Sequence, residues 1–136
     1  MSMDDNPGAI LVVEDSESCA TTLEIALSNV QGLNVILART VMEALRMLSG
    51  TAPVVRAVVT DLNMPRMSGF ELIDSIRRGD RHPGLPIIVV SGDSDPRAPG
   101  RARAAGADAY FSKPFSPARL KQKLEQLLNA NGTRET

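Results

Sequence analysis

Five short apolar runs, separated by stretches with the periodicity of helices, constrain the fold of this chain more than any other feature. They are rich in β-branched residues and lie at residues 9–13, 34–38, 54–60, 87–90 and 109–112. A run of this kind is typical of a strand that is buried on both faces of a parallel sheet. Because strands alternate with helices, we predict an α/β domain with helices on both faces of one sheet.

The intervening segments carry apolar side chains three or four positions apart, which is the spacing of one helix face. The predicted helices span residues 16–30, 40–49, 68–78, 99–105 and 116–129. The second and third begin with a capping box, Thr40 with Glu43 and Ser68 with Glu71. Pro96, Pro99 and Gly100 interrupt the region of the fourth helix, and its sequence offers only alanines to a core. We therefore predict a short, weakly held helix there.

Length and composition fit one domain. A chain of 136 residues can bury about 68% of its unfolded surface, and we predict a domain at residues 9–129, a loose lead-in at 1–8 and a frayed tail at 130–136. The net charge of −1 gives no reason to expect nucleic acid or a membrane surface as a direct partner. No apolar run approaches the roughly 20 residues of a membrane helix, and two acids stand where a secretory signal would be basic, so we expect a cytoplasmic protein.

Polar side chains follow four of the five predicted strands. Glu14 and Asp15 follow the first, and Asp61, Ser91 and Lys113 follow the third, fourth and fifth. The second strand ends in Ala38-Arg39, which offers no residue of use to such a site. A strand order of 2-1-3-4-5 places the second strand at the sheet edge and brings the other strand ends into one crevice. We therefore predict a doubly wound five-stranded parallel sheet with five helices and a site at its carboxyl edge.

The chemistry of these residues points to a cation and a phosphoryl group. Two carboxylates about 4 Å apart repel by about 4 kcal/mol at an effective dielectric constant near 20, so three in one crevice require a compensating cation. Their hard oxygens, with a loop carbonyl at Asn63, suit Mg²⁺. Asp61 could then attack a phosphoryl group as a carboxylate nucleophile, while Lys113 and the Ser91 hydroxyl hold the phosphoryl oxygens.

Each residue also has a simpler interpretation. Glu14 and Asp15 could favour the start of the first helix through its dipole, Ser91 could be a turn residue, and Lys113 a solvated charge. The presence of all these residues at four strand ends is much harder to obtain by chance. Cys19, on the inward stripe of the first helix, is interpreted as a packing residue.

Together these residues resemble the CheY-like receiver domain of two-component response regulators. The resemblance covers residues 9–129, nearly the whole chain. It rests on Glu14-Asp15, Asp61 followed by Met64-Pro65 and Gly69, Ser91-Gly92, and Tyr110 ahead of Lys113-Pro114-Phe115.

The resemblance implies a signalling phospho-acceptor rather than an enzyme that acts on other molecules. Asp61 would take a phosphoryl group from a histidine kinase or a phosphotransfer protein. Asp15, Asp61 and the Asn63 carbonyl would bind Mg²⁺, with Glu14 acting partly through water. Lys113 would pair with phosphorylated Asp61.

The resemblance also implies a switch. Ser91 and Tyr110 would move on phosphorylation and change the face made by the fourth helix, fifth strand and fifth helix, where an output partner or a second copy in a phosphorylation-dependent dimer would bind. Asn63 and Asp93 would tune hydrolysis, and because both are polar we expect a short-lived phosphoryl group. The Lys113–Pro114 peptide bond would be cis.

One segment departs from the family and two alternatives stay open. Residues 93–105 contain two prolines and no large apolar residue, so the output face could be mobile and become ordered on phosphorylation.

A flavodoxin-like cofactor carrier would need a phosphate-binding Ser/Thr/Gly loop where Glu14 and Asp15 stand. A degenerate receiver could act as a phosphorylation-independent protein scaffold.

Overall fold

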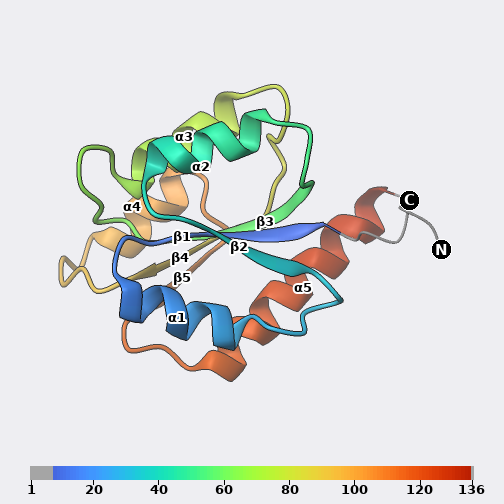
Figure 1. Ribbon diagram of the computed structural model, residues 1–136. Helices are drawn as coiled ribbons and strands as arrows, with labels where there is room; N and C mark the ends of the chain where they lie inside the picture. Colours follow the sequence, from blue (N-terminus) through green and yellow to red (C-terminus); the bar gives the residue numbers. More distant parts are fainter. Residues whose placement is uncertain (1–7, 136) are drawn as a thin grey trace.

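The computed structural model describes residues 8–135 and has the predicted sheet, with all strands parallel in the order β2-β1-β3-β4-β5 (Figure 1). The strands are β1 (Ala9–Val13), β2 (Asn34–Ala38), β3 (Val55–Thr60), β4 (Ile87–Ser91) and β5 (Ala109–Ser112). The helices are α1 (Glu17–Ala26), α2 (Val41–Ser49), α3 (Gly69–Arg78), α4 (Ala98–Ala105) and α5 (Pro117–Glu135). Residues 1–7 of the predicted lead-in lie outside the described residues.

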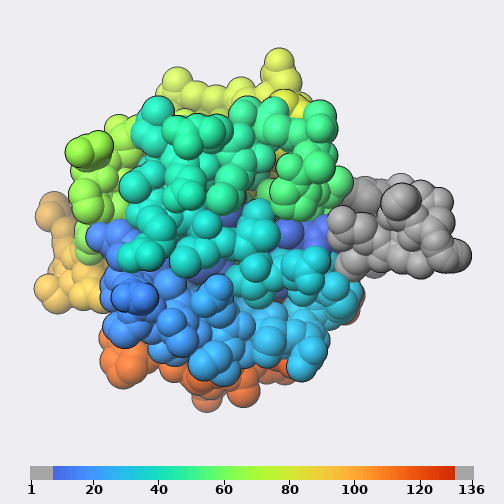
Figure 2. All heavy atoms as spheres, in the orientation of Figure 1, coloured from blue at the N-terminus to red at the C-terminus, as the bar shows by residue number. Residues whose placement is uncertain are grey.

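Two apolar clusters cover the two faces of the sheet. Successive strand side chains point to opposite faces, so Leu11 and Val13 pack with α2, α3 and α4, whereas Ile10 and Val12 pack with α1 and α5. Figure 1 shows these two helix layers on either side of the sheet, and Figure 2 shows all heavy atoms in the same orientation. All residues of β1 and β4 are buried, as continuous apolar runs require.

The predicted capping box forms completely at α3 and only in part at α2. At α3 both bonds are present, because the Glu71 amide donates to Ser68 Oγ over 3.4 Å and the Ser68 amide donates to Glu71 Oε1 over 2.7 Å. At α2 the Glu43 amide donates to Thr40 Oγ1 over 3.0 Å, but the Glu43 carboxylate accepts from the Arg39 amide over 2.8 Å. The Glu43 side chain therefore reaches one residue further back than the capping-box pattern predicts.

Two helix ends differ from the prediction. The first helix ends at Ala26 rather than Val30, because Asn29 and Gln31 adopt left-handed backbone angles, with φ of 65° and 51°. The last helix continues to Glu135 instead of fraying after residue 129. Its final segment contains no proline, and its one glycine costs only about 1 kcal/mol, which does not stop a helix. No helix among residues 8–135, α5 included, is both long and apolar enough to cross a membrane.

The fourth helix is short, as predicted. It has 8 residues, with Pro99 in its first turn, and the only side chains that it buries fully are the small ones of Ala98 and Ala102. The Arg101 guanidinium lies 4.5 Å from the centre of the Phe70 ring, which adds a contact to α3. The helix is regular but contacts the core only through the small side chains of Ala98, Ala102 and the partly buried Ala105.

Gly69 allows the chain after β3 to fold back on itself. A Cβ at this position would lie 2.3 Å from the Asp61 carbonyl oxygen and 2.9 Å from Leu62 Cα, both backbone atoms. The Gly69 amide donates to the Leu62 carbonyl over 2.8 Å. The start of α3 is thus packed against the backbone of Asp61, so any larger residue would displace that backbone.

We expect Gly69→Ala to lower the free energy of unfolding by about 1–3 kcal/mol, the usual cost of forcing extra atoms into a packed site. Gly100→Ala is the matched control, because its Cβ would meet no atom within 4 Å and a helical Gly→Ala change should stabilise by about 0.5–1 kcal/mol. Urea denaturation followed by circular dichroism measures both. Equal effects of the two substitutions would contradict the close approach at Gly69.

Candidate functional site

The carboxyl ends of β1, β3 and β5 bring three of the predicted site residues into hydrogen-bond contact. Lys113 Nζ lies 3.1 Å from Asp61 Oδ2 and 3.2 Å from Glu14 Oε1. The parallel register pairs Val13 with Thr60, so the residues that follow them, Glu14 and Asp61, lie on neighbouring strand ends. One ammonium group therefore bridges two carboxylates from different strands.

The Asp61 carboxylate is held in one orientation. Its Oδ1 accepts hydrogen bonds from the Leu62 amide over 2.7 Å and from the Asn63 amide over 3.2 Å. Its Oδ2 faces Lys113, and the residue is only 7% exposed. Bonds from backbone amides and an ammonium to a carboxylate are charge-assisted and strong. The remaining exposure leaves the carboxylate reachable from the sheet edge.

Glu14 is the acidic residue of the site whose negative charge is disfavoured by burial. It is 1% exposed, and its Oε2 accepts from the Ser16 amide over 3.1 Å. Burial raises the pKa of the Glu14 carboxyl and the charge of Asp61 raises it further, although bonds from Ser16 and Lys113 oppose the shift. Burial alone would lower the pKa of the Lys113 ammonium, but the hydrogen bonds and charges of Asp61 and Glu14 outweigh it and raise that pKa. Lys113 is therefore a permanent cation at neutral pH.

The oxygen atoms around Asp61 fit Mg²⁺ in their chemistry. Glu14, Asp15 and Asp61 offer carboxylates and Asn63 a backbone carbonyl; Asp15 and Asn63 are exposed. Among the described residues no three acidic, His or Cys side chains are placed to hold a metal ion together. Mg²⁺ commonly uses only one or two protein carboxylates and keeps several waters. The residues present therefore suit an ion held by few protein ligands.

Ser91 is fully buried at the end of β4 and is held by the loop that follows it. Its Oγ accepts from the Asp93 amide over 3.0 Å, and its carbonyl accepts from the Lys113 amide over 2.8 Å. The Asp93 carboxylate faces its own loop, where Oδ1 accepts from the Asp95 amide over 2.9 Å. The structure thus engages Asp93 in the loop through both its amide and its side chain.

Tyr110 lies on the other side of β5 from the α1–α5 layer, packed against the cluster beneath α2, α3 and α4. Its hydroxyl oxygen is buried and has no hydrogen-bond partner among the described residues. An unsatisfied buried hydroxyl is costly. The Lys113–Pro114 peptide bond that follows β5 is cis.

Cys19, which the sequence indicates as a packing residue, is partly buried in the first turn of α1. Its Sγ lies 3.5 Å from Lys113 Nζ, a contact that the sequence analysis did not predict. With Thr22, Lys113, Pro114 and Phe115 it lines a hollow of about 390 Å³ beside the acidic residues. The signal in the sequence was its position one turn after Glu14 and Asp15, which places it next to the strand end.

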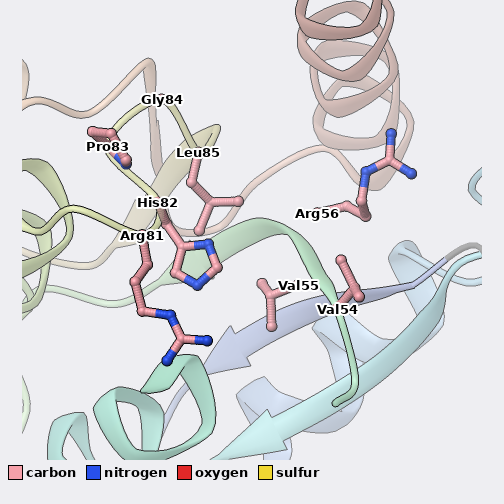
Figure 3. Close-up of a pocket in the computed structure, with 8 residues that line it drawn as sticks. All are labelled: Val54, Val55, Arg56, Arg81, His82, Pro83, Gly84 and Leu85. Carbon is pink, nitrogen blue, oxygen red and sulfur yellow. The ribbon is translucent and has the colours of Figure 1, made fainter. Parts of the chain in front are cut away.

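A second hollow of about 390 Å³ lies at the opposite end of the sheet, between the start of β3 and the loop before β4 (Figure 3). Arg81 and His82, which line it, bind the carbonyl end of α2. The Arg81 guanidinium donates to the Ser49 carbonyl, and His82 Nε2 lies 3.1 Å from the Leu48 carbonyl oxygen. Their polar groups thus connect the loop to α2.

Comparisons with known proteins agree on one family. Residues 10–125 match the family described as the response regulator receiver domain. The chain is 34% identical over 122 residues to chemotaxis protein CheY1 of Helicobacter pylori strain J99, covering 90% of this chain and 98% of that protein. It is 36% identical over 129 residues to the transcriptional regulatory protein PrrA of Mycobacterium leprae, covering 93% of this chain and 52% of that protein.

Solved structures show the same architecture. A CheY-like response regulator receiver domain protein of Methanospirillum hungatei superposes with a TM-score of 0.81 at 27% identity, covering 93% of this chain and 98% of that one. The chemotaxis response regulator CheY4 of Vibrio cholerae superposes with a TM-score of 0.76 at 28% identity, covering 88% of this chain and 98% of that one.

We expect Glu14→Gln to stabilise the protein at pH 7. The pKa of Glu14 is raised in the folded state, so its ionised form opposes folding, and the wild-type protein regains stability as pH falls through that pKa. The gain from Gln should therefore shrink on acidification. Urea denaturation at pH values from 4 to 7 measures it, with Glu24→Gln on the exposed face of α1 as the control. A gain that grows toward acid pH would contradict this assignment.

Tyr110→Phe should raise the free energy of unfolding by about 1 kcal/mol, because it removes a buried hydroxyl that finds no hydrogen-bond partner within residues 8–135. Thermal or urea denaturation of the unphosphorylated protein measures the change. A loss of stability would mean that the hydroxyl is satisfied in solution.

Proposed function

The chain belongs to the response regulator receiver domain family, and from this premise we propose that Asp61 is its phosphoryl acceptor. It is a receiver of the CheY type, a class that serves two-component signalling. The observation that carries the assignment to Asp61 is the geometry of its carboxylate, which is fixed by two backbone amides and faces the Lys113 ammonium at 3.1 Å.

In the proposed reaction a carboxylate oxygen of Asp61 forms a bond to phosphorus. The bond between phosphorus and the donor breaks at the same centre, and its electron pair returns to the imidazole nitrogen of a phosphohistidine, or to acetate when acetyl phosphate is the donor. The donor in the cell is a histidine kinase or a phosphotransfer protein. The protein modifies only itself and acts on no other substrate.

Lys113 and Ser91 stabilise the charge that the transfer brings. The Lys113 ammonium already contacts Asp61, and it stays protonated because its pKa is raised by Asp61 and Glu14. It can therefore neutralise a phosphoryl oxygen without a proton transfer. The Ser91 hydroxyl, at the end of the adjacent strand β4, donates to another phosphoryl oxygen. These two groups position the phosphoryl group and neutralise its negative charge, and phosphoryl transfer requires both.

Receiver domains generally use Mg²⁺ for phosphorylation, and the oxygen ligands of this chain suit that ion. Asp15, Asp61 and the Asn63 carbonyl would hold it, with Glu14 acting partly through water. When bound, the ion supplies positive charge that offsets the carboxylates and the incoming phosphoryl oxygens.

Ser91 and Tyr110 would carry the signal from Asp61 to the face formed by α4, β5 and α5. Phosphorylation would alter that face and thereby the binding of an output partner, or of a second copy. Asn63 and Asp93 would tune the lifetime of the phosphoryl group. The short contact of α4 with the core supports this output surface, since little buried apolar area resists its movement.

Incubation of the protein with Mg²⁺ and acetyl phosphate tests the acceptor. We expect one phosphoryl group per chain by intact mass, and more than a tenfold loss of incorporation in Asp61→Asn, which cannot form the acyl phosphate. Asp74→Asn, at an exposed position of α3 paired with Arg78, is the control and should be phosphorylated normally. Undiminished incorporation in Asp61→Asn would contradict the proposal.

A further inference from the structure

Three side-chain acceptors in succession hold the loop between β4 and α4, and we call them the turn series. Ser91 Oγ accepts from the Asp93 amide over 3.0 Å, and Asp93 Oδ1 accepts from the Asp95 amide over 2.9 Å. Asp95 Oδ1 accepts from the Arg97 amide over 2.9 Å. Each side chain thus binds the amide two residues ahead, and the series ends where α4 begins.

The sequence explains the turn series. Ser and Asp side chains readily bind the backbone amide two residues on, and here they alternate at positions 91, 93 and 95. The last link replaces a helix cap, because Arg97 at the N-cap position makes no side-chain capping bond. The Asp95 carbonyl also accepts from the Ala98 amide over 3.0 Å. Asp95 therefore anchors both the loop and the first turn of α4.

The turn series determines how the Ser91 hydroxyl is used. A serine hydroxyl has one proton to donate and two lone pairs that accept. The Asp93 amide occupies a lone pair of the buried oxygen, so the proton of the hydroxyl remains available to another acceptor. If the loop loosened, the Asp93 amide would leave and the hydroxyl would rotate freely. A fixed loop therefore keeps Ser91 oriented as a donor.

We propose that Asp95 is a positioning residue for phosphoryl transfer to Asp61, acting through the turn series on the Ser91 hydroxyl. This inference rests on the proposed function. The backbone contact carries the role, because the ion pair of Asp95 with Arg97 involves a guanidinium side chain that is 79% exposed, where solvent screens it. An amide oxygen at position 95 can accept the same backbone bond.

Rates of phosphorylation by acetyl phosphate with Mg²⁺ test the role of Asp95. Losing a well-placed donor to a developing charge slows reactions by large factors, so we expect Asp95→Ala to be at least about fivefold slower than wild type. Asp95→Asn should recover most of the rate, and Arg97→Ala, which removes only the ion pair, should match wild type. Asp95→Ala at the wild-type rate, or Asp95→Asn as slow as Asp95→Ala, would overturn the proposal.

A double-substitution cycle separates positioning from general destabilisation. If Asp95 acts through Ser91, then Asp95→Ala should cause no further slowing in a Ser91→Ala background. An equal slowing in both backgrounds would overturn the proposal, because it would show an effect that does not pass through the hydroxyl.

Hydrogen exchange of the Asp93 amide, followed by NMR in the unphosphorylated protein, tests the turn series independently of phosphorylation. We expect protection in wild type and Asp95→Asn, and at least a tenfold loss of protection in Asp95→Ala. Unchanged protection in Asp95→Ala would overturn the inference. Failure of wild-type protein to take up a phosphoryl group would instead overturn the proposed function, so the two failures are distinguishable.

Discussion

The contact of one ammonium group with two buried carboxylates is the interaction on which the site depends. Glu14 and Asp61 come from different strands, and Lys113 bonds to both. Two carboxylates about 4 Å apart would repel by about 4 kcal/mol without a cation at an effective dielectric constant near 20. The ammonium comes from the end of β5, two strands away from β3 in the sequence of elements and at the far side of β4 in the sheet, so the contact depends on the order in which β1, β3, β4 and β5 pair.

The same charge balance suits a signalling site. The excess of carboxylates suits the proposed divalent cation, and Lys113 would pair with the proposed phosphoryl group on Asp61. Two backbone amides fix the Asp61 carboxylate, and the Asp93 amide binds the buried Ser91 oxygen. The neighbouring α4 contacts the core only through small alanine side chains. A firmly held centre therefore lies beside a lightly held helix.

Much of the fold followed from the sequence, because buried parallel strands leave apolar runs with polar ends. The strand order and the meeting of Glu14, Asp61 and Lys113 were predictable from those ends. The end of α1 at Ala26 was not predictable. Asn29 adopts a left-handed backbone angle there, and residues 17–30 contain no proline or glycine that would have indicated the stop. Contacts that depend on side-chain direction were also missed. Neither the approach of Cys19 to Lys113 nor the turn series through Asp95 follows from periodicity.

Chemical identification of the phosphorylated side chain tests whether Asp61 is the acceptor without any substitution. The protein is treated with Mg²⁺ and acetyl phosphate and then with borohydride, which reduces an acyl phosphate of aspartate to homoserine. Peptide mass spectrometry then identifies the position at which aspartate has become homoserine. We expect homoserine at position 61 alone. Homoserine at another acidic residue, or phosphate retained on His82 with position 61 unchanged, would contradict it.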